Sequence, residues 1–297
     1  MATIWKVYWV AERRGDSFQR AYFRDLLASR ELLVNLTQRE IRGKYKRTAL
    51  GQLWSLANPI AAIIVYTFIF SVVFRVPAQI GDPSGLNNYA LWLVCGLLPW
   101  LFFNSTITLG VRSIVDNANL VQKVYFPRLV IPLSLTGAGM VNWMFEMAVL
   151  AIALTIFGAF VLPWIPLTIA FMLLLGVFAA GLSMLLSIAN VHFRDLAYLL
   201  TVLLQFWFYL TPILYPISLV QAQSDRWGGL LGTPITLVDL YKVNPMEPFV
   251  NIFRDLLYHN TWPALPSVWA AMAWAFVTFA VGLWVFSKKD KNLAELI

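Results

Sequence analysis

The chain has 297 residues, of which 60% are hydrophobic and 12% are charged, and its formal net charge is +7. Soluble domains contain about 45–50% apolar and about 25% charged residues, so this composition excludes a water-soluble globule, and the high hydrophobicity excludes a disordered chain. The apolar runs are continuous and about 20 residues long, which excludes the alternating pattern of a transmembrane β-barrel and predicts membrane-spanning helices.

The first 53 residues are predicted to form a basic N-terminal extension on the cytoplasmic side. Within it, residues 30–48 mix leucines with basic residues, a pattern typical of an amphipathic helix lying in the membrane interface. The basic side chains expected at the headgroups are Arg39, Arg42, Lys44, Lys46 and Arg47. Two interpretations stay open: an anchor for the first span, or a collar around a cytoplasmic partner.

Uncharged stretches predict an all-α membrane protein with six transmembrane helices. The spans are expected at residues 54–74, 89–111, 129–157, 164–190, 198–216 and 267–287. The transmembrane domain therefore covers 54–290, and 291–297 form a short cytoplasmic tail. Gly137 with Gly139 and Gly176 with Ala180 permit close contact between helices.

The distribution of basic residues predicts the orientation of these spans. Eighteen of the 22 lysines and arginines fall on one side, and only Arg75, Arg226, Lys242 and Arg254 fall on the other. The positive-inside rule then places both termini in the cytoplasm. This basic surface faces anionic lipid headgroups, so no nucleic-acid partner is expected.

The loop at 112–128 is too polar to enter lipid, yet its apolar residues recur near helical spacing. We expect a short helix that ends before Pro127. This helix either simply connects two spans or is a rigid element that transmits the movement of a soluble, energy-supplying partner protein to the spans.

Two kinds of side chain within the spans are candidates for function. Glu146 is the only ionisable residue well inside a span, and it shares a helix face with Asn142. Two interpretations of Glu146 stay open. It can form part of a surface that couples to protons or binds substrate, or it can make interhelical hydrogen bonds as a protonated acid, which is the interpretation we favour.

Aromatic residues can line a conduit for sugars or simply pack against other side chains. The aromatic candidates for a substrate channel are Tyr66, Phe70, Trp100, Phe103, Trp207 and Tyr209.

The outer segment at 217–262 is broken by prolines and contains an amphipathic run at 249–258. It is too short for an independent domain, so its apolar face is expected on the outer leaflet or on the spans. It forms either a cap or gate at the external mouth or a re-entrant filler without a mechanical role.

The sequence contains none of the common catalytic or metal-binding motifs. It has no phosphate-binding loop and no zinc spacing, and its two histidines, His192 and His259, are expected on opposite sides of the membrane. The single cysteine, Cys95, cannot form an intrachain disulfide. We therefore expect no enzyme active site, no metal and no cofactor in this chain.

Four segments together resemble the membrane subunit of type-2 ABC transporters that export polysaccharides, the family of O-antigen, teichoic acid and galactan exporters. Their order and spacing relative to the six predicted spans make the resemblance specific. The segments are residues 44–54 (KYKRTALGQLW), 124–134 (VYFPRLVIPLS), 192–213, which begin HFRD and end TPI, and 244–255, which begin NPMEP.

The resemblance implies a permease in the bacterial cytoplasmic (inner) membrane that forms a homodimer and binds two copies of a separate ATPase. That partner would bind ATP and Mg²⁺, and a lipid-linked polysaccharide would cross outward between the two protomers. Two rivals remain: a drug or small-lipid efflux permease of the same superfamily, and a membrane-embedded glycosyltransferase or ion-driven carrier.

The resemblance also implies roles for two segments that composition leaves open. Residues 112–126 would be the coupling helix, with contacts to the ATPase from Asp116, Asn119, Gln122, Lys123, Tyr125 and Arg128. Residues 217–262 would form short external gate helices, with Pro245, Phe249, Phe253, Arg254 and Asp255 in the gate.

Overall fold

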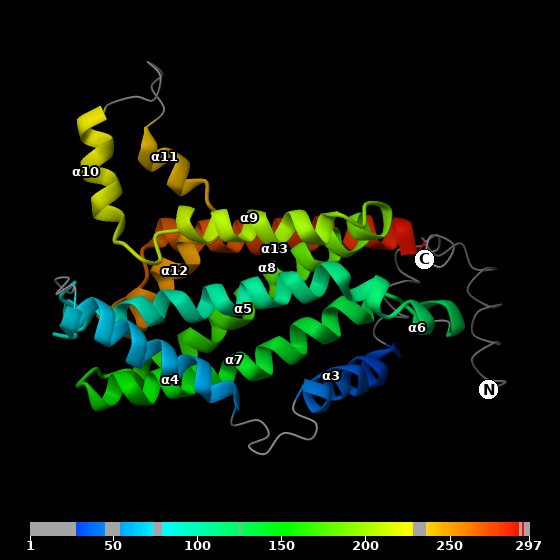
Figure 1. Ribbon diagram of the computed structural model, residues 1–297, viewed down its shortest axis with the longest axis horizontal. Helices are drawn as coiled ribbons and strands as arrows, with labels where there is room; N and C mark the ends of the chain where they lie inside the picture. Colours follow the sequence, from blue (N-terminus) through cyan, green and yellow to red (C-terminus); the bar gives the residue numbers. More distant parts are fainter. Residues whose placement is uncertain are drawn as a thin grey trace.

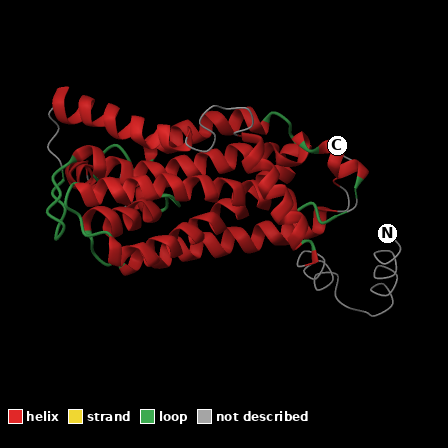
Figure 2. Ribbon diagram, turned by 90° about the horizontal axis from the view of Figure 1, so that it is seen from below, coloured by secondary structure: helices red, strands yellow, loops and turns green. Residues whose placement is uncertain are grey.

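The computed structural model describes residues 28–44, 54–73, 79–124, 126–227, 236–290 and Leu293. Within these residues every regular element is a helix (Figure 2). The all-α fold expected from the sequence is confirmed for this part of the chain.

Four helices of the described chain are long and apolar enough to cross a membrane. They are α5 (Tyr89–Asp116), α7 (Val130–Ile156), α8 (Ile165–His192) and α13 (Leu265–Lys289). All four extend along the long axis of the molecule (Figure 1). They correspond to the second, third, fourth and sixth predicted spans.

The other two predicted spans form shorter helices. The first is α4 (Trp54–Tyr66) followed by a π-helical segment, Thr67–Val73. The fifth is α9 (Leu196–Leu210), which has 15 residues. It ends before Thr211 because Pro212 disfavours a helical conformation in the residue that precedes it. A span needs about 20 residues, so the count of six spans and the cytoplasmic position of both termini stay predictions.

Helix α5 is longer than the predicted second span. It begins where the Asn88 side chain accepts hydrogen bonds from the backbone N–H groups of Ala90 and Leu91. It then continues past residue 111 to Asp116 and is followed, after Asn117, by the short α6 (Ala118–Lys123). The segment 112–126, expected to be one short helix, is therefore divided. Its first residues form the last turn of α5, which continues past its apolar part to Asp116, and later residues form the separate helix α6.

The two ends of the bundle hold different short elements. Helices α10 (Ile217–Trp227) and α11 (Leu237–Lys242) extend from one end, and α6 lies at the other end near the last turn of α13 (Figure 1). The segments that the sequence assigns to opposite sides of the membrane thus lie at opposite ends of the molecule.

Helix α12 (Glu247–Arg254) and the π-helical turn Asp255–His259 are buried within the bundle instead of covering it. Helix α12 packs on α5, α8 and α13. Its Phe249 stacks on Phe178 at 5.7 Å between ring centroids, and its Phe253 meets Trp143 edge-on at 5.5 Å. Of the two positions expected for this amphipathic run, the structure selects the one on the spans.

Helix α3 (Arg30–Lys44) packs along α7. Leu36 is buried, and Thr37 lies 3.4 Å from the position that a β-carbon on Gly137 would occupy. The small residue at 137 therefore lets α3 approach α7 closely.

Candidate functional site

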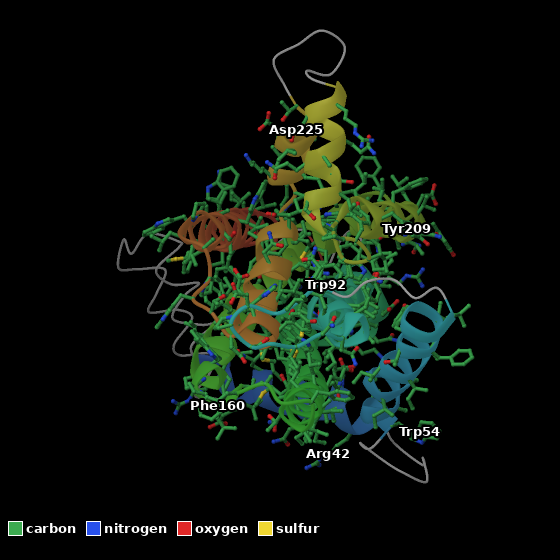
Figure 3. The ribbon with its side chains drawn as sticks, turned by 90° about the vertical axis from the view of Figure 1, so that its left-hand side faces the viewer. Arg42, Trp54, Trp92, Phe160, Tyr209 and Asp225 are labelled. Atoms are coloured by element: carbon green, nitrogen blue, oxygen red, sulfur yellow. The ribbon has the colours of Figure 1, made fainter. Side chains whose placement is uncertain are left out.

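A groove with a volume of about 720 Å³ runs between α4, α5 and α9. Figure 3 shows α4, which begins at Trp54, and the end of α9 at Tyr209 on the same flank of the molecule. The lining side chains are Ala61, Val65, Tyr66, Leu97, Trp100, Leu101, Asn104, Thr108, Thr201, Leu204, Gln205, Phe208 and Tyr209.

The groove combines aromatic rings with uncharged polar groups. The aromatic members are Tyr66, Trp100, Phe208 and Tyr209, and the polar members are Asn104, Thr108, Thr201 and Gln205. Among the described residues, no charged side chain lines it. Aromatic faces and single amides or hydroxyls suit a neutral molecule with apolar ring faces and hydroxyl edges. Without ionic contacts, such a surface lets its occupant slide.

Three of the residues predicted for a substrate channel, Tyr66, Trp100 and Tyr209, line this groove. Glu146 lies elsewhere, in a separate cavity between α3, α5 and α7. The side chain of Phe70 lies outside the described residues.

Two other predicted channel residues serve packing within the bundle. Phe103 is fully buried and stacks on Phe178 at 5.4 Å. Trp207 is half-buried, and its indole N–H donates to Asn244 Oδ1 at 2.7 Å. Neither side chain lines the groove, so the prediction that they contact substrate receives no support from its geometry.

The end of α5 and α6 present polar side chains at one end of the bundle. The exposed members of the predicted coupling set are Asp116, Asn119, Gln122 and Lys123. Tyr125 lies outside the described residues. The four exposed side chains are accessible to a partner that docks at this end.

Arg128 differs from these four because it is buried. Its guanidinium donates to the backbone carbonyl of Asp290 and lies 3.7 Å from the Asp290 carboxylate. Burial raises the pKa of Asp290, and the positive charge of Arg128 opposes that rise. In this conformation Arg128 joins the segment after α6 to the end of α13, so a direct contact with a partner would require it to leave this pocket.

Helix α3 contacts the turn between α5 and α6. Arg39 donates to the Asn117 side-chain oxygen at 2.9 Å and forms an ion pair with Glu40 at 2.7 Å. Arg42 and Lys44 are also exposed on α3, whereas Lys46 and Arg47 lie outside the described residues. The predicted interface and coupling elements are thus in direct contact.

The predicted gate residues occupy the opposite end of the bundle. Phe249, Phe253 and Arg254 are buried, whereas Pro245 and Asp255 are half-buried. Burial raises the pKa of Asp255 to about 6, against the opposing effects of the Ala264 backbone N–H and the Arg254 charge.

Arg254 ties this segment to two others. Its guanidinium donates to the carbonyls of Pro212 and Ile213, each at 2.6 Å, and more weakly to that of Trp92 at 3.4 Å. It also lies 3.5 Å from the centroid of the Trp92 ring, within the range of a cation–π contact. One side chain therefore connects α12 with α5 and with the segment that follows α9.

Sequence reasoning missed part of the groove. Asn104 and Thr108 are four apart on α5, and Thr201, Gln205 and Phe208 follow a similar spacing on α9. Uncharged polar residues at helical spacing within two apolar helices were the available signal. The pairing of Arg254 with Trp92 left no such signal, because the two residues are 162 positions apart.

Comparison with known proteins gives consistent results. Residues 31–258 match the family model described as ABC-2 type transporter. The chain is 29% identical over 274 residues to the O-antigen export system permease protein RfbA of Myxococcus xanthus, covering 92% of this chain and 98% of that protein. It is 30% identical over 275 residues to the protein of the same name from Klebsiella pneumoniae, covering 90% and 95%. It is 23% identical over 226 residues to the polysialic acid transport protein KpsM of Escherichia coli, covering 74% and 83%.

Proposed function

The chain belongs to the ABC-2 type transporter family, and from that premise we propose that it is the membrane permease of an ATP-driven exporter of a lipid-linked polysaccharide. The names of its relatives, permeases for O-antigen and a transport protein for polysialic acid, support a polysaccharide as the substrate. The observation that carries the proposal is the uncharged groove along α4, α5 and α9, whose rings and amides match the chemistry of sugars.

The proposed translocation path lies between two copies of the chain, with their grooves facing each other. The solvent-exposed side of α9 beside the groove is strongly apolar, with Leu199, Val202, Leu203 and Phe206 each about half or more exposed. A partner helix or lipid must cover such a surface. In this arrangement six spans hold both termini in the cytoplasm of a bacterium, and the path opens across its cytoplasmic membrane.

The proposed energy source is a separate ATPase, present in two copies, that docks at the α6 end. ATP binding favours one conformation of the complex and its hydrolysis products favour the other, so export is driven by differential binding and not by chemistry in this chain. The contact of Arg39 with Asn117 supports a joint movement of α3 and α6 during this cycle.

Reversal of charge at Lys123 tests the docking site. We expect Lys123→Glu to reduce co-purification of the ATPase and its stimulation several-fold, because this exposed cation lies on the helix proposed to enter the partner. The melting temperature of the isolated permease is expected to stay unchanged, since the Lys123 side chain is exposed. Arg226→Glu, at an exposed position on α10, is the matched control. Unchanged association of the Lys123→Glu permease contradicts the proposed docking site.

Removal of one ring from the groove tests the substrate path. Tyr209→Ser is expected to slow export several-fold without changing the melting temperature, because Tyr209 lines the groove and is 56% exposed. Tyr198→Ser is the control, because Tyr198 lies on the same helix, is 72% exposed and is outside the groove. Equal export rates for the two variants argue against substrate contact at Tyr209.

Depletion of the protein in its native host tests the function itself. Mass spectrometry then identifies the lipid-linked glycans, and a membrane-impermeant probe reports the leaflet in which they lie. Accumulation of polymer-length glycan on the cytoplasmic leaflet is the expected result. Normal glycan levels and sidedness would reject polysaccharide export and favour efflux of a drug or lipid.

A further inference from the structure

Helix α6 is too short to be stable without support from the rest of the molecule. It has six residues, whereas isolated helices shorter than about 12–15 residues are marginal in water. Its exposed side chains are Asn119, Gln122 and Lys123, and its buried side chain is Val121. The contacts of α6 and of the segments beside it therefore decide how it is held against the bundle.

An apolar cluster at this end of the bundle supplies part of that support. It is separate from the main core and joins residues of α3, α5, α6, α7, α8 and α13. Val121 of α6 and Phe126, which follows α6, belong to this cluster. So do Phe286, near the end of α13, and Leu293, which is fully buried although it lies beyond α13. The C-terminal end of the chain thus contributes to the cluster in which α6 is anchored.

A buried polar contact joins the same two parts of the chain. Arg128, between α6 and α7, donates to the backbone carbonyl of Asp290 and lies 3.7 Å from the Asp290 carboxylate. Both residues are buried. Among the described residues, Arg128 Nε and Asp290 Oδ1 have no hydrogen-bond partner. Each of these two charged groups is compensated by the other, so removing either side chain leaves a buried charge without its counterion.

A different contact holds α6 at its beginning. Asn117, directly before α6, accepts a hydrogen bond from Arg39 of α3 at 2.9 Å, and this contact is exposed. An exposed polar contact contributes little net stability, because water replaces it, whereas breaking a buried charged pair is costly. Of the two contacts, the one between Arg128 and Asp290 therefore has the larger influence on α6.

We propose that Arg128, Asp290 and Leu293 are positioning residues for α6. Through them, the C-terminal end of the chain holds α6 in the orientation that leaves its polar side chains exposed. The consequence for docking of an ATPase rests on the proposed function, but the position of α6 within this chain does not.

The mobility of a spin label on α6 tests the proposal in the full chain. Cys95→Ala removes the native thiol, and Gln122→Cys carries a nitroxide label on the exposed side of α6. A second sample carries the label at Gln223→Cys, an exposed position on α10 at the opposite end of the bundle (Figure 1). Electron paramagnetic resonance in lipid nanodiscs then reports the rotational correlation time of each label, without ATP or any partner protein.

We expect Arg128→Met to shorten the correlation time of the label at position 122 by about half or more, because α6 loses its buried polar anchor. Methionine removes every donor to Asp290 and keeps a long apolar side chain. The label at position 223 should not change, since only a general loss of stability would loosen both ends. Arg128→Lys keeps the positive charge and one donor group, so it should restore part of the order at position 122.

Two further variants keep the test decisive if Arg128→Met fails to accumulate in the membrane. Asp290→Ala removes the carboxylate and keeps the backbone carbonyl, and Leu293→Ala removes part of the apolar anchor. Each should loosen the label at position 122 less than Arg128→Met does. Lys289→Met is the matched control, because Lys289 is exposed next to Asp290, and it should leave both labels unchanged.

The unlabelled variants test the consequence for docking. Arg128→Met should reduce co-purification of the ATPase from native membranes several-fold, although every exposed side chain of α6 is intact. Loosening of α6 without loss of the ATPase would contradict a role of its orientation in docking. If the wild-type protein retains no ATPase, the proposed function fails, while the label still reports whether α6 is positioned as proposed.

Three results would overturn the proposal. One is an unchanged correlation time at position 122 in Arg128→Met, or in both Asp290→Ala and Leu293→Ala. Another is an equal change at position 223, because the effect would then not be specific to α6. The last is an equal effect of Lys289→Met.

Discussion

Arg254→Ala is expected to lower the free energy of unfolding by about 3 kcal/mol or more and to abolish export. The substitution leaves the carbonyls of Pro212 and Ile213 without their donor in a buried place, at a cost of roughly 1–3 kcal/mol for each unpaired group. It also removes the cation from the Trp92 ring and opens a cavity beside Gly96, whose β-carbon position lies 3.0 Å from the guanidinium. Thermal melting of the purified protein measures the effect.

Two further variants separate charge from geometry at this position. Arg254→Lys keeps the positive charge but loses the planar guanidinium that reaches two carbonyls at once. The melting temperature of this variant should therefore fall between those of the Arg254→Ala variant and the wild-type protein. Arg226→Ala removes an exposed arginine and should leave the melting temperature within about one degree. If Arg254→Ala melts like wild type, the proposed link between α12 and the segment after α9 does not stabilise the fold.

Gly282→Val is expected to destabilise the protein by about 3 kcal/mol or to prevent its accumulation in the membrane. A β-carbon at residue 282 would lie 2.6 Å from the backbone oxygen of Gly181, and one at residue 181 would lie 2.5 Å from the backbone nitrogen of Phe279. These contacts involve backbone atoms of α8 and α13, so a larger side chain can be accommodated only if the two helices separate. Membrane yield and the melting temperature report the result.

Gly43→Ala is the matched control for this glycine. Gly43 is also helical, but nothing lies within 4 Å of the position of its β-carbon. Alanine favours the helix by about 1 kcal/mol over glycine, so this variant should be as stable as wild type or slightly more stable. Comparable loss in both variants would show that the crossing of α8 and α13 is not the cause.

The two residues of largest expected effect bear on the proposed mechanism in different ways. The glycine contact holds α8 closely against α13. Arg254 instead connects α12 to the short segment between α9 and α10, where the backbone leaves the helix at Thr211. Arg254 therefore ties the end of α9, beside the groove, to α12.

The sequence predicted several elements well because their signals are local. The second, third, fourth and sixth spans follow from the length of uncharged apolar runs, and α7 (Val130–Ile156) lies within one residue of its predicted bounds. The family also followed from local motifs, since segments such as NPMEP and VYFPR keep their order along the chain. The buried run in α12 was recognised as amphipathic, although its position inside the bundle was only one of two expected.

What the sequence by itself determined about this protein is its membrane class, its helical fold and its family, because run length, charge and motif are properties of neighbouring residues. Only the tertiary structure decided which faces meet: the groove of α5 with α9, Arg254 over Trp92, Gly282 against Gly181, and Trp143 with Glu146 in one cavity. The physical reason is that an apolar helix in a membrane is hydrophobic on all sides, so its periodicity does not specify its rotation. That rotation is fixed by close packing and by buried polar partners far apart in the chain.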